Sequence, residues 1–112
     1  MNPDGAAAED LALSHLVAHG CRLVSRNFRS RFGEIDLIVS HGPALVFVEV
    51  RKRSRRDYSS AADSITAAKR QRIVATAQIY LARRRDDVPC RFDAVLVDGT
   101  GRIEWVRDAF GA

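Results

Sequence analysis

The stretch GEIDLIVSHGPALVFVEVRKRS, residues 33–54, contains two apolar runs separated by a short segment of different composition. The runs cover residues 33–40 and 44–51, and they are rich in Ile, Val, Leu and Phe, side chains that favour strands. Between them, residues 41–43 contain the Gly and Pro that are typical of a turn. The stretch therefore predicts an antiparallel hairpin, and the rest of the chain is interpreted outward from it.

The chain on either side of this hairpin predicts two helices and three further strands. Upstream lie a helix over residues 4–19 and a short strand over 21–28; downstream lie a helix that begins near Ser64 or Thr66 and strands over 91–99 and 102–106. The order is α-β-β-β-α-β-β, which predicts an α/β fold with a mixed sheet flanked by helices. The 112 residues suit one domain that spans the whole chain, residues 1–112.

Each predicted helix has an apolar stripe at helical spacing. In the first, Leu13, Leu16, Val17 and Gly20 share one face, and Glu9 lies four residues before Leu13. Glu9 is therefore interpreted either as an acid at the end of the core-facing stripe or as a first-turn acid that complements the helix dipole. The second stripe is longer and clearer; it contains Ile65, Ile73, Val74, Ala77, Tyr80 and Leu81.

Three carboxylates lie within the hairpin, Glu34 and Asp36 on its first strand and Glu49 on its second. An ionised side chain in a half-buried strand is costly unless it has a partner. With a four-residue connection over 41–44, Asp36 lies directly opposite Glu49; a connection of odd length places the two on opposite faces. The sequence alone leaves both registers open.

If Asp36 and Glu49 do meet, their repulsion must be offset. A shared proton is one solution. A divalent cation is another, because Mg²⁺ is commonly bound by one or two carboxylates together with waters and substrate phosphates. Acids near a metal and surrounded by Arg and Lys are typical of a site that cleaves phosphodiesters.

The chain is basic, with 18 Lys and Arg against 14 Asp and Glu and a net charge of +4. This balance permits an anionic partner without requiring one. Basic residues gather at 51–56, directly after the second hairpin strand, and again at 69–72. The second group, which contains Lys69 and Arg72, is interpreted either as a solvated helix face or as a surface that tracks phosphates.

Other residue types predict no separate site. Cys21 and Cys90 lack a C-x-x-C spacing and are expected to be small buried side chains. The three His residues have no metal-ligand spacing, and Asp93 is expected to cap or to pair with Arg91. No signal peptide and no apolar run of membrane-spanning length is found, so we expect a cytoplasmic protein with no membrane partner.

Four motifs together resemble a known family. They are N-F-R-x-x-x-G-E-I-D-L-I, L-V-F-V-E-V-R, K-R-Q-R-I-x-x-x-A-x-x-Y-L and R-F-D-A-V, and they extend over nearly the whole chain. This pattern resembles the bacterial YraN/UPF0102 family of small uncharacterised proteins. That family is similar in turn to archaeal Holliday-junction resolvases and to the wider restriction-endonuclease-like superfamily.

The resemblance implies a restriction-endonuclease-like sheet and a set of site residues. Asp36 corresponds to the metal-binding acid, Glu49 to the second ligand and the backbone carbonyl of Val50 to a third. Glu9 corresponds to the acid on the first helix. The implied cofactor is Mg²⁺ or Mn²⁺, and the implied partner is nucleic acid, most of all DNA; resolvase-like relatives also suggest a homodimer, by analogy only.

One position departs from the pattern. The superfamily has Lys two residues after the second acid, where this chain has Arg51, with Lys52 next to it. Arg binds phosphate well but is a poor base, and the two are not interchangeable at a shaped site. The resemblance therefore implies Arg51 as the catalytic cation, while a regular strand directs Lys52 to the opposite face.

Three functions are consistent with these residues. The first is a Mg²⁺-dependent, nuclease-like protein that acts on DNA, including branched structures. The second is a nucleic-acid-binding or adaptor module with a weakened site, which the Arg51 substitution favours. The third is a protein-interaction subunit that binds no nucleic acid. In the first two, the nucleic-acid backbone is expected to contact Lys52, Arg53, Arg55, Arg56, Lys69 and Arg72.

Overall fold

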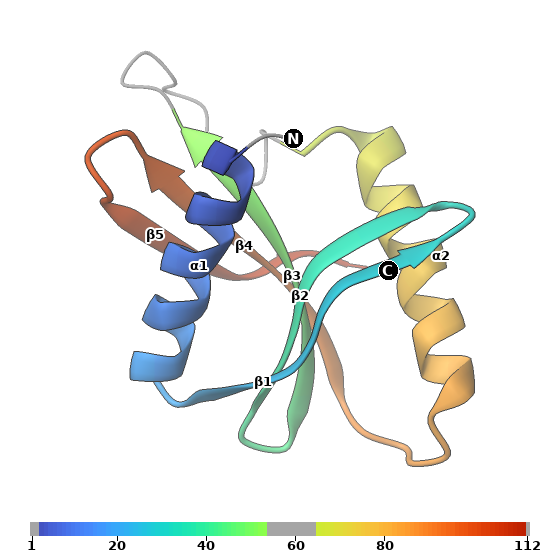
Figure 1. The fold of residues 1–112 in the computed structure, drawn as a ribbon. Helices are drawn as coiled ribbons and strands as arrows, with labels where there is room; N and C mark the ends of the chain where they lie inside the picture. The colour runs from blue at the N-terminus through green and yellow to red at the C-terminus, as the bar shows by residue number, and fades with distance from the viewer. Residues whose placement is uncertain (1–2, 54–64, 112) are drawn as a thin grey trace.

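The computed structural model describes residues 3–53 and 65–111, and it contains two helices and five strands in the predicted order (Figure 1). The elements are α1 (Pro3–Ala18), β1 (Cys21–Ser30), β2 (Gly33–His41), β3 (Ala44–Arg53), α2 (Ala67–Arg83), β4 (Cys90–Asp98) and β5 (Ile103–Phe110). The α-β-β-β-α-β-β prediction is confirmed. Most element ends differ from the predicted ones by one or two residues, because terminal turns and strand ends carry weak sequence signals.

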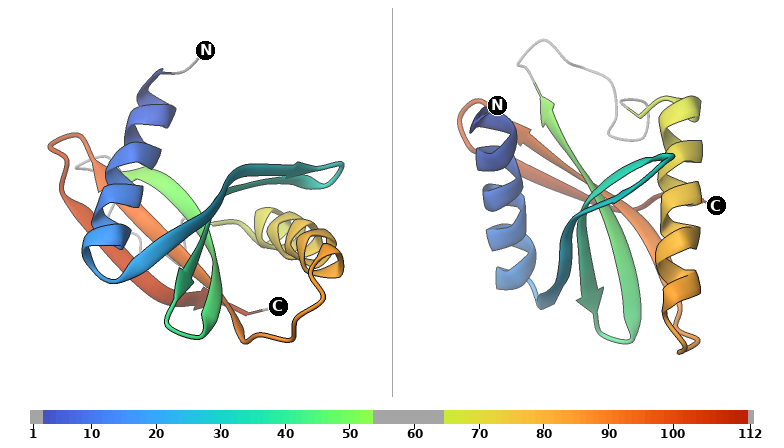
Figure 2. Two further views of the ribbon diagram at one scale, coloured as in Figure 1. Left: turned by 60° about the horizontal axis from the view of Figure 1, so that its bottom comes forward. Right: turned by 45° about the vertical axis from the view of Figure 1, so that its right-hand side comes forward.

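The five strands form one mixed sheet in the order β1-β2-β3-β4-β5. Neighbours are antiparallel except β3 and β4, which run parallel. A parallel pair needs a long crossover, and α2 lies in that crossover. The two helices flank the sheet on opposite sides, with α1 on one face and α2 on the other (Figures 1 and 2).

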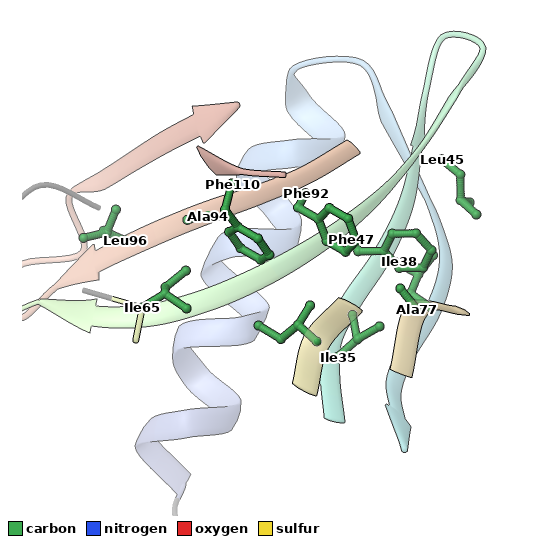
Figure 3. Packing of buried hydrophobic residues seen from close by; sticks show 11 residues of the cluster. Ile35, Ile38, Leu45, Phe47, Ile65, Ala77, Phe92, Ala94, Leu96 and Phe110 are labelled. Atoms are coloured by element: carbon green, nitrogen blue, oxygen red, sulfur yellow. The ribbon is translucent and has the colours of Figure 1, made fainter. Parts of the chain in front are cut away.

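The central strands are buried on both faces, as expected for a sheet covered by helices. Along β3, Phe47 packs in the core between the sheet and α2, whereas Val46 and Val48 pack in the core between the sheet and α1. Figure 3 shows the α2-side core, where Phe47 lies between Ile38 and Phe92. The period-two alternation of this strand is what separates the two cores.

The face by which α1 packs on the sheet differs from the predicted stripe. Its buried residues are Ala8, Ala12 and Leu16, whereas Val17 is 51% exposed. Small Ala side chains allow the helix to approach the sheet closely, so the helix buries its smallest residues in place of some larger ones. This rotation places Glu9 beside the buried Ala8, at the edge of the packed face.

The β1–β2 hairpin extends past the rest of the sheet and lies against α2 (Figure 2). A hydrogen bond of 2.8 Å joins the hydroxyls of Ser30 and Thr76. A Cβ on Gly33 would lie 3.5 Å from the Cβ of Arg72, so the hairpin backbone and the helix are close neighbours here. This contact closes one side of the pocket described below.

Two further expectations concern exposure. Cys21 is buried as predicted, but Cys90 is exposed, so its interpretation as a buried side chain is wrong. Cys90 is the first residue of β4, and the residues from Phe92 to Val97 are the ones that this strand buries. Within residues 3–53 and 65–111, no helix is long and apolar enough to cross a membrane.

Candidate functional site

The register of β2 and β3 brings two of the predicted acids together. Ser40 pairs with Leu45, as the four-residue connection requires, and the ladder continues to Leu37 and Val48. One further step of this register places Asp36 opposite Glu49. Both carboxylates line a pocket of about 270 Å³, together with Gly33, Glu34, Lys69, Arg72 and Ile73. Of the two registers that the sequence left open, the structure therefore has the one that places both acids on one face.

The alternation of β2 breaks directly before Asp36, which shares the α2-side face of the strand with Ile38. Ile35 packs in the α2-side core and Leu37 in the α1-side core, although residues two apart on a regular strand face the same way. The β2–β3 ladder ends at this point, and the amide of Val50 lies beyond it. That amide donates to Oδ2 of Asp36 at 2.8 Å, so the carboxylate replaces a missing ladder hydrogen bond.

The protonation of Asp36 is strongly affected by this environment. Burial raises the pKa of its carboxyl from the ordinary 3.8, and the neighbouring charges of Glu49 and Glu9 raise it further, to about 7. The Val50 amide and the Lys69 ammonium act in the opposite direction. In the metal-free protein, Asp36 therefore carries a proton below neutral pH.

Replacing Asp36 with Asn should stabilise the metal-free protein at alkaline pH. Below about pH 4 the folded and unfolded forms both hold the proton; between there and about pH 7 only the folded form does, so wild-type stability falls as the pH rises. A shift of this size corresponds to about 4 kcal/mol at full burial. Since Asp36 is partly exposed, we expect a gain on the order of 2 kcal/mol at pH 8.

Urea unfolding in EDTA at pH 4 and pH 8 measures this effect. The gain should be present at pH 8 and absent at pH 4, because the wild-type carboxyl is then neutral too. Asp87→Asn, which removes an exposed carboxylate, serves as the control and should show no such difference. An equal effect of Asp36→Asn at both pH values would contradict the raised pKa.

Glu49, on β3, has a cationic partner on helix α2. Its side chain is only 4% exposed, and its Oε1 lies 2.7 Å from Nζ of Lys69 on α2. An ionised carboxylate buried to this degree needs such a partner. From the sequence, Lys69 was interpreted as part of a solvated helix face or of a surface that tracks phosphates. In the structure, its ammonium instead contacts one carboxylate of the acid pair.

Glu9 approaches the same cluster from α1, as the resemblance implies. Its Oε1 accepts a hydrogen bond of 3.0 Å from the Asn27 amide, which also donates to Oε1 of Glu34 at 2.7 Å. Arg26 supplies its charge partner, with Nε 3.4 Å from the Glu9 carboxylate. Glu9 thus lies beside the acid pair, joined through Asn27 to a residue that lines the pocket.

Asn27 was not predicted as a site residue. It lies on β1 between Arg26 and Phe28, which pair with Leu37 and Ile35, so it is opposite Asp36 at the place where β2 changes its facing. Its φ is 55°, a left-handed conformation that Asn tolerates better than most residues. The Asn in the N-F-R motif was the available signal, because Asn is disfavoured within strands.

The predicted cations at the end of β3 and beyond it have different surroundings. Arg51 is half-buried and follows Glu49 by two residues in regular register; its guanidinium makes no hydrogen bond or ion pair with residues 3–53 or 65–111. Lys52, the next residue of the strand, is exposed. Arg53 forms an ion pair of 2.5 Å with Glu104 on β5. Arg55 and Arg56 lie outside the residues that the structure describes.

Further cations lie on α2 and on the hairpin tip. Arg72 is exposed on α2 and is the one of them that lines the pocket. At the turn between β1 and β2, the guanidinium of Arg31 lies 4.8 Å from the ring centroid of Phe32, which is 40% exposed. Arg29 is 77% exposed, with Nε 3.6 Å from the Glu34 carboxylate. The pocket therefore combines an acidic floor with a basic rim that carries one exposed aromatic ring.

The acids do not form a complete metal shell of side chains. Among the described residues, no group of three or more His, Cys, Asp or Glu side chains is arranged to hold a metal ion. The carboxylates of Asp36 and Glu49 still match the oxygen donors that Mg²⁺ prefers, since that ion keeps several waters. The donors present therefore fit a partly hydrated Mg²⁺ or Mn²⁺.

Comparison with known proteins gives the chain its family. A model of the uncharacterised protein family UPF0102 matches residues 8–97. The chain belongs to this family. A UPF0102 protein of Dechloromonas aromatica is 56% identical over 96% of this chain and 88% of its own length. Another from Shewanella amazonensis is 48% identical over 98% of this chain and 100% of its own.

These UPF0102 relatives cover the whole arrangement around the pocket, because the family match begins at Ala8 and ends within β4. Among solved structures, Pyrococcus furiosus SfsA in complex with Ca²⁺ overlaps with a TM-score of 0.33 and 15% identity. The overlap covers 92% of this chain, which spans 62% of that protein. At this TM-score the likeness supports no conclusion about the UPF0102 chain.

Proposed function

We propose that this UPF0102 protein is a Mg²⁺-dependent, nuclease-like protein that acts on DNA, including branched structures. The observation that carries the proposal is the buried pairing of Asp36 and Glu49 in one pocket below a basic rim. Placing two carboxylates together costs free energy in the metal-free protein. A protein that only bound phosphates would gain nothing from acids that face them.

The acid pair is the proposed metal site. Asp36 and Glu49 would hold Mg²⁺, with the carbonyl of Val50 as the third ligand that the resemblance implies. When bound, the ion supplies positive charge to the phosphate oxygens and lowers the pKa of a coordinated water. Glu9 lies beside the pair and keeps the surroundings negative, which favours a cation.

The basic rim is the proposed DNA contact. Arg72 lines the pocket, and Arg31 lies on the β1–β2 turn two residues before Gly33, which also lines it; these positions suit contacts with successive phosphates. Phe32 adds an exposed ring beside these cations, and such rings stack on unpaired bases. A ring at a hairpin tip suits DNA whose bases are unpaired near a junction or flap better than a continuous duplex.

Calorimetric titration of the metal-free protein with Mg²⁺ or Mn²⁺ tests the metal half of the proposal. Binding should release about one proton near pH 6, because Asp36 must ionise to coordinate. The release is measured as a dependence of the observed heat on the ionisation enthalpy of the buffer. Absence of binding in the millimolar range would remove the enzyme function.

Fluorescence anisotropy with a labelled four-way junction, in Ca²⁺ or EDTA, tests the DNA half. Affinity should fall steeply with salt. Arg31→Ala with Arg72→Ala should lower the slope of log K against log salt by about two, one for each lost phosphate contact. The control, Arg22→Ala with Arg85→Ala, removes two exposed charges away from the pocket and should leave the slope unchanged. Salt-independent binding, or none, would favour a protein-interaction subunit.

One observation favours the second candidate, a nucleic-acid-binding module without turnover. Arg51 stands where the superfamily pattern has Lys, and an Arg does not replace that Lys at a shaped site. Such a module would bind the junction and the metal but would not cleave. Incubation of the junction with excess protein in Mn²⁺ separates the two candidates, because even a slow nuclease produces a cut at a defined position.

A further inference from the structure

The position of Lys69 contradicts the usual rules for the start of a helix. Thr66 caps α2, and its hydroxyl accepts the amide of Lys69 at 3.2 Å, so Lys69 is the third residue of the helix. Glu or Gln is favoured at this position, and cations are disfavoured at the positive end of the helix dipole. The first turn of α2 contains no acidic residue to compensate. Local rules are broken most often where function requires it.

The Lys69 ammonium reaches the acid pair across the gap between helix and sheet. Its Nζ lies 2.7 Å from the nearly buried Glu49, while the Lys69 side chain remains 40% exposed. Both residues line the same pocket. The ammonium is therefore held at the floor of the pocket and is still open to a ligand that enters.

We propose that Lys69 supplies, from helix α2, the cation that the superfamily pattern places two residues after Glu49, where this chain has Arg51. This inference rests on the proposed nuclease function. Lys69 is a compact charge fixed on the acid pair, whereas Arg51 has no hydrogen bond or ion pair with residues 3–53 or 65–111. A fixed charge contributes more at a developing negative charge than one that must first be ordered.

The step is the hydrolysis of a phosphodiester. A water oxygen forms a bond to phosphorus and releases its proton to solvent, and the bond from phosphorus to the leaving sugar oxygen breaks. The leaving oxygen takes up a proton from solvent. Lys69 remains protonated throughout and contacts a non-bridging phosphate oxygen, where negative charge increases in the transition state.

Lys69→Gln is the test, because Gln keeps a hydrogen-bond donor for Glu49 and suits the third helix position. Single-turnover cleavage of the junction should fall about 100-fold. The affinity for Mg²⁺ should rise, by up to roughly tenfold, because a cation that competes for Glu49 is removed.

Three comparisons make the assignment specific. Lys69→Arg should restore part of the rate, and Arg51→Gln should cost less than about tenfold. Arg83→Gln removes the same charge at the far end of α2 and should change neither rate nor metal affinity. A weaker Mg²⁺ affinity in Lys69→Gln would instead make Lys69 a structural support of the site, and would overturn the inference.

The inference and the proposed function fail in different ways. If wild type cleaves and Lys69→Gln cleaves equally well, Lys69 is not the cation and only this inference is overturned. If wild type binds Mg²⁺ and the junction but never cleaves, both the inference and the enzyme function are overturned. If Arg51→Gln lowers the cleavage rate more than Lys69→Gln does, the catalytic cation is Arg51 and the inference is overturned.

Discussion

Asp36→Asn and Glu49→Gln should each lower the rate of junction cleavage in Mg²⁺ by at least about a thousandfold. Each removes a charged oxygen that holds the proposed metal, and a loss of about 4 kcal/mol of transition-state stabilisation corresponds to that factor. Both should also weaken Mg²⁺ binding, measured by calorimetry. This result separates them from Lys69→Gln, for which metal binding should strengthen.

Neither substitution should act by unfolding the protein. Asn at position 36 can still accept the Val50 amide, and it removes a carboxyl that is costly to ionise. Asp10→Asn is the matched control, because it removes an exposed carboxylate that is paired with Arg26 on the surface. Cleavage that persists in purified Asp36→Asn would mean that the activity is a contaminant or that the site lies elsewhere.

The hairpin was predictable because it depends on neighbouring residues, and its register was reduced to two alternatives. The even-length connection between β2 and β3 is the one that the structure has, and the alternation of β3 then places Glu49 toward α2. The alternation of β2 breaks only at Ile35, and counted from Ile38 it also directs Asp36 toward α2. The register brought it to the right position, and the side-chain bond to Val50 could not be read from spacing.

Contacts between distant elements were the part that the sequence did not reveal. Lys69 meets Glu49 only because α2 packs on the sheet at one particular rotation and height. The packed face of α1 was predicted only in part. Leu16 is buried and Leu13 packs against the same core, but the helix also buries Ala8 and Ala12 and leaves Val17 exposed. Large apolar residues are the ones expected to be buried on a helix, but where a helix packs close to a sheet, its smallest residues can be buried instead.

A second buried carboxylate, Asp93, shows that the family motifs include structural residues as well as site residues. It belongs to the R-F-D-A-V motif and is fully buried on β4. It accepts two hydrogen bonds from Arg91, at 2.8 and 2.9 Å, and further bonds of 2.9 Å from the Trp105 indole and the Asp108 amide. The prediction that Asp93 pairs with Arg91 is confirmed, and the pocket that contains Asp36 does not include it.

Asp93→Ala should therefore destabilise the protein by about 3–5 kcal/mol, because it leaves a half-buried guanidinium and two further donors without an acceptor. At roughly 4 °C per kcal/mol for a domain of this size, Tm should fall by roughly 12–20 °C in calorimetry. Any protein that remains folded should keep its Mg²⁺ affinity, since Asp93 does not line the site.

The chain contains a matched control for this prediction in the Arg84–Asp86 pair. It has the same Arg-x-Asp spacing and the same two-bond geometry, with Nε and Nη2 of Arg84 at 2.9 and 2.5 Å from the carboxylate, but it lies on the surface. Exposed pairs contribute about 0–1 kcal/mol, so Asp86→Ala should shift Tm by less than about 4 °C. Equal losses in the two variants would show that burial is not the cause. The two pairs have the same chemistry, so the difference between the Tm losses of Asp93→Ala and Asp86→Ala measures the effect of burial. Water can replace the lost carboxylate at the surface but not in the protein interior.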